Sequence, residues 1–120
     1  MQATVEYEPV VTKLLEKSRQ GRVNWERRGL KNGWRQFECT IEGQYTFSLA
    51  RTDDEGYELA MRDSERDIIF SVKSGSAIVY RDAKEAELSS TLRDLYELVR
   101  KKALNVDEKI ATATGLLDRI

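Results

Sequence analysis

The sequence of 120 residues has no histidine, one cysteine and one proline. Without histidine, catalytic arrangements such as Ser-His-Asp or Cys-His are excluded, and so is haem ligation by histidine. A structural zinc site is excluded as well, because zinc needs three or four ligands that are mostly cysteine or histidine. These absences lower the expectation of catalysis, and we predict a protein that is not an enzyme and uses no cofactor and no metal.

The single cysteine and the absence of long apolar stretches bear on the cellular compartment in which the protein is expected. One cysteine cannot form an internal disulfide, so a reducing cytosol is expected. No apolar stretch is long enough to cross a membrane, and no secretory segment follows Met1. The sequence therefore predicts a cytoplasmic protein without membrane contact.

What the chain does contain is 40% apolar and 34% charged residues, in a length that fits one domain over residues 1–120. The formal net charge of −1 conceals a strong segregation of charge. Residues 1–36 carry a net charge of +4, residues 37–80 carry −5, and residues 81–120 are neutral. The overall charge does not favour nucleic acid as a partner, although a local basic patch remains open.

Hydrophobic spacing predicts a helix, then a sheet. Apolar residues at helical spacing after Pro9 predict a first helix over residues 9–20, which ends before Gly21. Strict alternation of apolar and polar residues then predicts strands, separated by short polar turns, over residues 37–41, 45–49, 57–61 and 68–72. Short connections between strands are typical of an antiparallel meander, of four strands or of five if residues 77–80 add another. Val23 and Trp25 also alternate with polar residues, and residues 29–33 are expected to form a loop.

The last third returns to helical spacing. A long helix is predicted from about Asp82, with an apolar face of Leu88, Leu92, Leu95, Tyr96 and Val99. Asn105 is suited to end this helix, and Asp107 to cap a final helix whose apolar stripe is Ile110, Ala113 and Leu117. The predicted fold class is α+β: an N-terminal helix, a meander sheet of four or five strands, and two C-terminal helices packed on one face of the sheet.

The strongest candidate site is the basic stretch from Lys17 to Arg35, which has a net charge of +6 and contains both tryptophans. Arginine can hold phosphate in a forked contact, and tryptophan offers a face on which a base can stack. The candidate residues for binding a ligand or a partner are Arg22, Arg27, Arg28, Lys31, Trp34 and Arg35. Trp25 is expected to point inward. The competing interpretation is that these cations are solvated or pair with the acidic middle segment.

Two other motifs carry little chemistry. Asp63, Glu65 and Asp67 have the spacing of the first calcium-loop ligands, but Ile68 and Ser74 stand where such a loop needs glycine and glutamate. Cys39 lies in phase with apolar neighbours, so we interpret it as a structural residue.

The segment from Leu92 to Lys109 resembles the C-terminal part of a family of small uncharacterised bacterial α+β proteins. The counterparts of the family's short helix and Trp-containing first strand are residues 14–17 and 23–26. The resemblance implies a bacterial cytosolic origin and no catalytic residue.

Three hypotheses for function follow. The first is a non-enzymatic binding protein of bacterial or phage origin, of the immunity, inhibitor or adaptor type, with a role in phage defence or counter-defence as one setting. Segregated charge favours electrostatic complementarity with a protein partner or with a second copy, so a homo-oligomer is expected. The second is a sensor or sponge for a phosphorylated nucleotide. The third is a small enzyme that works through carboxylates or lysine.

Overall fold

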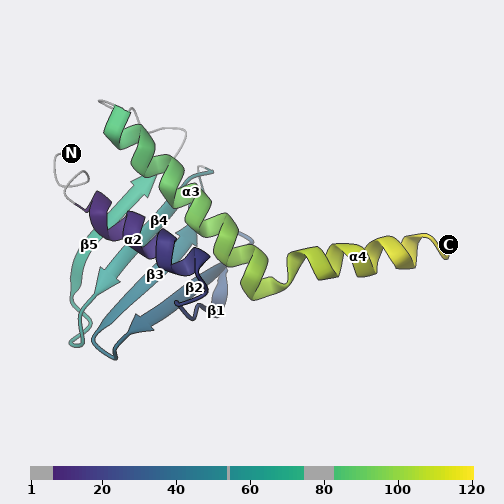
Figure 1. Cartoon of the computed structure of the whole chain (residues 1–120), viewed down its shortest axis with the longest axis horizontal. Helices are drawn as coiled ribbons and strands as arrows, with labels where there is room; N and C mark the ends of the chain where they lie inside the picture. The colour runs from purple at the N-terminus through teal and green to yellow at the C-terminus, as the bar shows by residue number, and fades with distance from the viewer. Residues whose placement is uncertain (1–6, 54, 75–82) are drawn as a thin grey trace.

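The computed structural model describes residues 7–53, 55–74 and 83–120. Within these residues, one helix precedes five strands, and two helices follow them (Figure 1). The elements are α2 (Glu8–Arg19), β1 (Glu26–Lys31), β2 (Trp34–Ile41), β3 (Tyr45–Arg51), β4 (Tyr57–Arg62), β5 (Ile68–Ser74), α3 (Ala83–Leu104) and α4 (Val106–Leu117). The predicted α+β class is confirmed, and the first helix lies within one residue of the predicted range.

The five strands form one antiparallel sheet in the order of the sequence. Phe37, Leu49, Leu59 and Val72 lie opposite one another across four strands, and none of them is more than 1% exposed. Such cross-strand rows stabilise a sheet and fix its register. The neighbouring positions, which include Glu38, Ser48 and Ser71, are polar and lie on the opposite face. The alternation in the sequence predicted both faces.

The prediction of a loop over residues 29–33 is wrong, because β1 continues to Lys31 and only two residues form the turn. Asn32 and Gly33 both have positive φ, 54° and 83°, and the strands pair on either side of them. An Asn-Gly pair in this conformation closes a tight hairpin, since both residues tolerate positive φ. Val23 and Trp25 precede β1 instead of lying within a strand. The strand considered for residues 77–80 lies outside the described residues.

The helices α2 and α3 lie side by side on one face of the sheet (Figure 1). The predicted apolar face of α3 is confirmed: Leu88, Leu92, Leu95, Tyr96 and Val99 are all at most 2% exposed. From α2, Val11, Leu14 and Leu15 complete the same core. No helix of the described residues is both long and apolar enough to span a bilayer.

The last helix, α4, differs from the other two because none of its residues is buried. Asn105 separates it from α3 with a left-handed backbone (φ 51°, ψ 49°) and caps it, so Asp107 lies in the first turn and is not the cap that we predicted. Figure 1 shows α4 pointing away from the sheet. The radius of gyration of 15.8 Å exceeds the value of about 13.6 Å expected for a compact domain of this length.

Candidate interaction surfaces

The basic stretch is placed on the β1–β2 hairpin, where acidic residues compensate part of its charge. The Arg28 guanidinium lies 3.1 Å from a carboxylate oxygen of Glu26 and 3.0 Å from one of Glu38. The Lys31 ammonium lies 3.7 Å from the Glu58 carboxylate. Glu38 and Glu58 belong to the acidic middle segment, so the competing interpretation of the sequence holds for Arg28 and Lys31.

The other candidate residues are distributed along the same edge. The Arg35 side chain donates a hydrogen bond of 2.9 Å to the backbone carbonyl of Arg28, across the hairpin. Arg27 is exposed on β1, and Arg22 is exposed in the connection before it. Among the described residues, neither Arg22 nor Arg27 has a carboxylate within ion-pair distance. Arg27 on the hairpin and Arg22 in the connection before it are therefore available to an anion.

Arginine side chains lie over the Trp34 ring, so the ring face that they cover is not free for stacking. The guanidinium carbon of Arg51 lies 4.1 Å from the centroid of the Trp34 ring, and that of Arg100 lies 5.4 Å away. Both distances are typical of cation–π contacts. Trp34 thus joins β2 to β3 and α3, which gives it a structural role at this end of the sheet.

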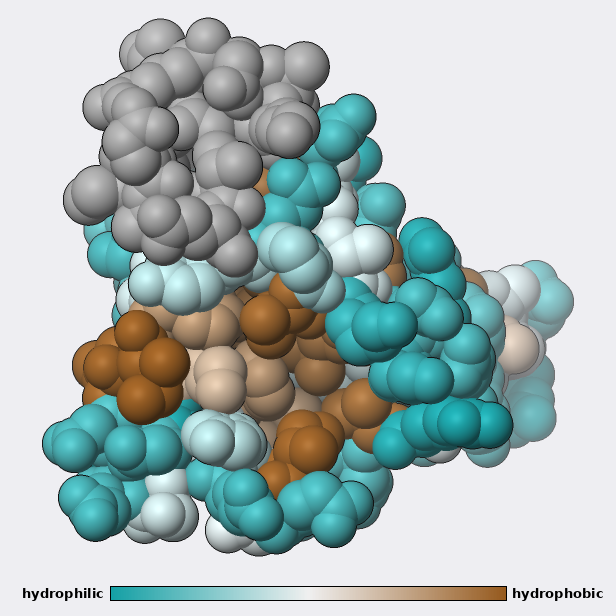
Figure 2. Space-filling model, turned by 60° about the vertical axis from the view of Figure 1, so that its left-hand side comes forward, coloured by the Kyte–Doolittle hydropathy of each residue, from teal (hydrophilic) through white to brown (hydrophobic). Residues whose placement is uncertain are grey.

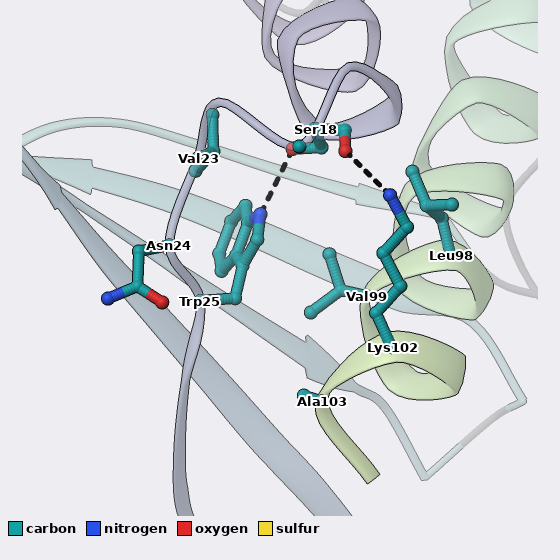
Figure 3. A pocket seen from close by; sticks show the side chains of 9 residues that line it. Ser18, Val23, Asn24, Trp25, Leu98, Val99, Lys102 and Ala103 are labelled. Carbon is teal, nitrogen blue, oxygen red and sulfur yellow. Dashed lines mark hydrogen bonds between the residues drawn. The ribbon is translucent and has the colours of Figure 1, made fainter. Parts of the chain in front are cut away.

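Trp25 points inward, as predicted, and closes a pocket between the ends of α2 and α3 (Figure 3). Its indole N–H donates a hydrogen bond of 3.0 Å to the Ser18 hydroxyl, and the Lys102 ammonium donates one of 3.2 Å to the Ser18 carbonyl. A cation at the last carbonyls of a helix is favoured by the helix dipole. The pocket has a volume of about 200 Å³. Its polar groups are bonded to one another, so they tie the two helices together.

The buried titratable groups lie in the core. Burial raises the pKa of the Cys39 thiol from 9.0 to about 12, which keeps it protonated and unreactive at neutral pH. Burial also raises the pKa of Tyr96, whose hydroxyl donates a hydrogen bond of 2.7 Å to the Arg35 carbonyl. Cys39 is therefore structural, in agreement with its position in the sequence pattern.

The acidic residues at Asp63 form a turn. One carboxylate oxygen of Asp63 accepts hydrogen bonds from the backbone N–H groups of Glu65 and Asp67, at 2.9 and 3.0 Å. Such bonds are typical of aspartate in turns. Within the described parts of the chain, no three acidic or cysteine side chains come together in a way that could hold a metal ion.

A groove with a volume of about 390 Å³ runs along α2 on the side of the sheet's helix-covered face. One wall is formed by α2, and the other by residues of the connection, of β2 and of β3: Val23, Ile41 and Phe47. From α2, the groove is lined by Pro9, Val10, Lys13, Leu14 and Lys17. On the face of the molecule that carries α2 and β5, Figure 2 shows apolar residues gathered in the middle, with hydrophilic residues around them.

A second apolar surface lies on α4. Ile110, Leu116, Leu117 and Ile120 are between 53% and 99% exposed. Helical spacing places Val106, Ile110, Ala113 and Leu117 in one stripe along the helix. A stripe of large aliphatic residues that is fully open to water marks a surface for another molecule.

The sequence analysis did not identify the groove, although one signal of it was present. The apolar positions of α2 form two adjacent rows, Val10 with Leu14 and Val11 with Leu15. Such a wide stripe can serve two neighbours, because one row faces about 100° away from the other. Val11 and Leu15 are buried in the core, whereas Val10 is 38% exposed. Lys13 and Lys17 lie beside the Val10 row, at its boundary with the solvent.

Comparisons with family models, with curated proteins and with solved structures found no match to this chain. The resemblance of residues 92–109 to a bacterial family thus stays a prediction. The functional argument has to come from the surfaces of the chain itself.

Proposed function

We propose that this protein is a non-enzymatic interaction protein and that α4 is the element that contacts its partner. The observation that carries the proposal is that α4 buries none of its residues while it exposes three large aliphatic side chains, those of Ile110, Leu116 and Leu117. An amphipathic helix that inserts its apolar face into a groove is a common mode of protein recognition.

The length of α4 supports this proposal. Helices shorter than about 12–15 residues are marginal in water on their own, and in proteins they are stabilised by packing of an amphipathic face. The 12 residues of α4 receive no such packing from the body of the chain. A partner that covers the stripe would both stabilise the helix and remove its apolar surface from water.

Composition supports the cellular setting that we propose. The lone cysteine is buried as a thiol, which suits a reducing cytoplasm. Small size and segregated charge suit an immunity, inhibitor or adaptor role in a bacterium or phage. The enzyme alternative has less support, because the sequence offers no histidine and the one thiol is buried.

The alternative of a binder for a phosphorylated nucleotide draws its support from Arg22 and Arg27 alone. Arg28 and Lys31 already pair with carboxylates, and Arg51 lies over the Trp34 ring. A ligand there would compete with these contacts, whereas a partner of α4 displaces only water.

Native mass spectrometry of the protein purified from its own cells tests the proposal. The test variant replaces two residues of the stripe, Ile110→Lys and Leu117→Lys. The control variant carries Ala111→Lys and Thr112→Lys, which add the same charge on the other side of α4. Both control lysines stand four residues after an acidic residue, so they favour the helix.

We expect the wild type and the control to be recovered with at least one further chain, and the stripe variant to be recovered alone. Recovery of the wild type as a single chain of 13.8 kDa would contradict the proposal. So would a further chain that the stripe variant retains in full.

A further inference from the structure

Two uncovered apolar surfaces of matching form occur on this one chain. The groove beside α2 is lined by apolar side chains of three elements, and the stripe of α4 has no cover. Both α2 and α4 have 12 residues, which is a length of about 18 Å each. The groove is lined by α2 from Pro9 to Lys17, about 12 Å, so it can hold about two thirds of a helix of this length.

The two surfaces also complement each other in charge. Lys13 and Lys17 lie on the rim of the groove, and within the described residues neither has a carboxylate in ion-pair distance. On α4, Asp107 and Asp118 are eleven residues apart, about three helical turns, so they flank the same side of the stripe. The last turn of α4 contains no basic residue. The other side of the stripe carries Lys109, so it is the acidic side with Asp107 and Asp118 that matches the basic rim of the groove.

The chain's own α4 does not occupy this groove. Asn105 turns the chain at the end of α3, and α4 leads away from the sheet, whereas the groove lies beside α2 (Figure 1). A second copy brings the same helix without this constraint. Because each copy has one helix and one groove, the contact can form twice about a two-fold axis, and it then closes without leaving a free surface.

We propose that α4 of one copy lies in the α2 groove of a second copy, and the reverse, in a two-fold homodimer. This inference rests on the proposed function of α4 and names its partner as the same protein. Val10, Lys13 and Lys17 then contact the stripe and the acidic flank of the partner helix. Two reciprocal helix contacts double the area that one helix alone would bury, toward the roughly 800 Å² per partner of stable interfaces.

Two single substitutions test the groove and the helix separately. Leu117→Lys damages α4 and leaves the groove intact, whereas Val10→Glu damages the groove and leaves α4 intact. Both positions are exposed, so neither change removes a core contact. Thr112→Lys and Thr12→Glu are the controls on the two helices, because these positions are exposed and lie off the stripe, off its acidic side and off the groove. Circular dichroism establishes that every variant is folded.

Light scattering across micromolar concentrations should give twice the chain mass of 13.8 kDa for the wild type and for both controls. Each test variant should dimerise more weakly, by about tenfold or more, since a large aliphatic side chain is lost from each contact. An equimolar mixture of the two test variants should recover a heterodimer, because it retains one intact contact and its other contact pairs opposite charges. Native mass spectrometry with one variant isotopically labelled detects this species.

A monomeric wild type overturns the homodimer. If the protein from its own cells then still carries another chain through the α4 stripe, the proposed function stands with a different partner. A dimer that Leu117→Lys disrupts but Val10→Glu does not overturns the groove as the docking site. Loss of the dimer in the two controls, or a mixture that stays monomeric, overturns the helix exchange as well.

Discussion

The two consecutive helices α3 and α4 carry the same kind of apolar stripe and have opposite environments. The stripe of α3 contributes five side chains that are at most 2% exposed, whereas α4 contributes no buried residue. One residue, Asn105, separates them with a left-handed backbone. Amphipathic spacing therefore specifies that a helix needs a cover, but it does not specify whether the cover belongs to the same chain.

The largest effect that distinguishes the two helices is the loss of a core contact. Leu95→Ala in α3 should lower the free energy of unfolding by about 2–5 kcal/mol, because it removes a fully buried side chain and leaves a cavity. Leu117→Ala in α4 should leave the stability of the monomer within about 0.5 kcal/mol of the wild type. Urea unfolding at a concentration low enough to dissociate any dimer measures both.

A substantial loss of monomer stability in Leu117→Ala would contradict the comparison, since it would mean that the stripe of α4 packs on its own chain. The Leu95→Ala variant in turn shows whether the assay detects a lost core contact. The two variants remove the same atoms, so their difference reports the environment alone.

A pH titration tests the other half of the comparison, the burial of the core on which α3 packs. Cys39 belongs to the cluster on which α3 packs, and its pKa rises from 9.0 to about 12 on folding. Because the pKa is higher in the folded state, the folded state favours the protonated thiol. Its contribution to the free energy of unfolding is fully present below pH 9 and is lost as the pH rises toward 12. The contribution of this thiol to the loss should be on the order of 1 kcal/mol at pH 10.

Unfolding of the wild type and of Cys39→Ala at pH 8 and at pH 10 measures this contribution as the difference in their pH dependence. All other groups are the same in both chains, so their effects cancel. An equal loss of stability in both chains would mean that the thiol is not desolvated in the folded protein.

The residue that separates the helices should have an effect smaller than the loss of a core leucine. Asn105→Val should cost about 1–2 kcal/mol, because a β-branched residue is strained at a φ of 51°. Asn105→Gly should be tolerated, since glycine adopts this conformation freely. If α4 is docked on a partner, the valine variant should also weaken association, because relief of the strain would redirect the helix.

Comparison of the two variants by urea unfolding and by light scattering checks this prediction. Equal stability of the valine and glycine variants would indicate that the left-handed turn is not required between the two helices.

The sequence predicted those parts of the molecule that local rules determine. Period-two alternation located β2 to β5, and the helical spacing of Leu88 to Val99 located the core face of α3. The local pattern failed in two places where non-local pairing decides the result. Leu30 and Lys31 belong to a strand because β2 pairs with them, although Gly29, which favours a loop, lies where the register shifts between Arg27 and Leu30. The ion pairs of Arg28 with Glu38 and of Lys31 with Glu58 depend on a sheet register that charge counts do not contain.

The groove was missed for a related reason. The apolar spacing after Pro9 predicted a helix, but it does not show which of its apolar residues face the core. Only the packing distinguishes Val11, Leu14 and Leu15, which belong to the core, from Val10, which is 38% exposed beside the groove. The unpartnered state of α4 is likewise a property of the fold, since its spacing is that of an ordinary packed helix.

The smallest effect is expected for the basic hairpin, which contrasts with α4 as a rival interaction surface. The double variant Arg27→Ala and Arg28→Ala should remain folded, because both side chains are exposed and the ion pairs of Arg28 are screened by water. Its association measured by light scattering should match that of the wild type, since neither Arg27 nor Arg28 is among the eight residues that line the groove. Isothermal titration with a nucleoside triphosphate at low salt examines the alternative function in the same pair of proteins. Binding by the wild type that the double variant and added salt both abolish would make the hairpin an anion site, because exposed charge contacts are sensitive to screening. Loss of association in the double variant would instead bring β1 into the interface and would shift the partner surface from α4 to the edge of the sheet.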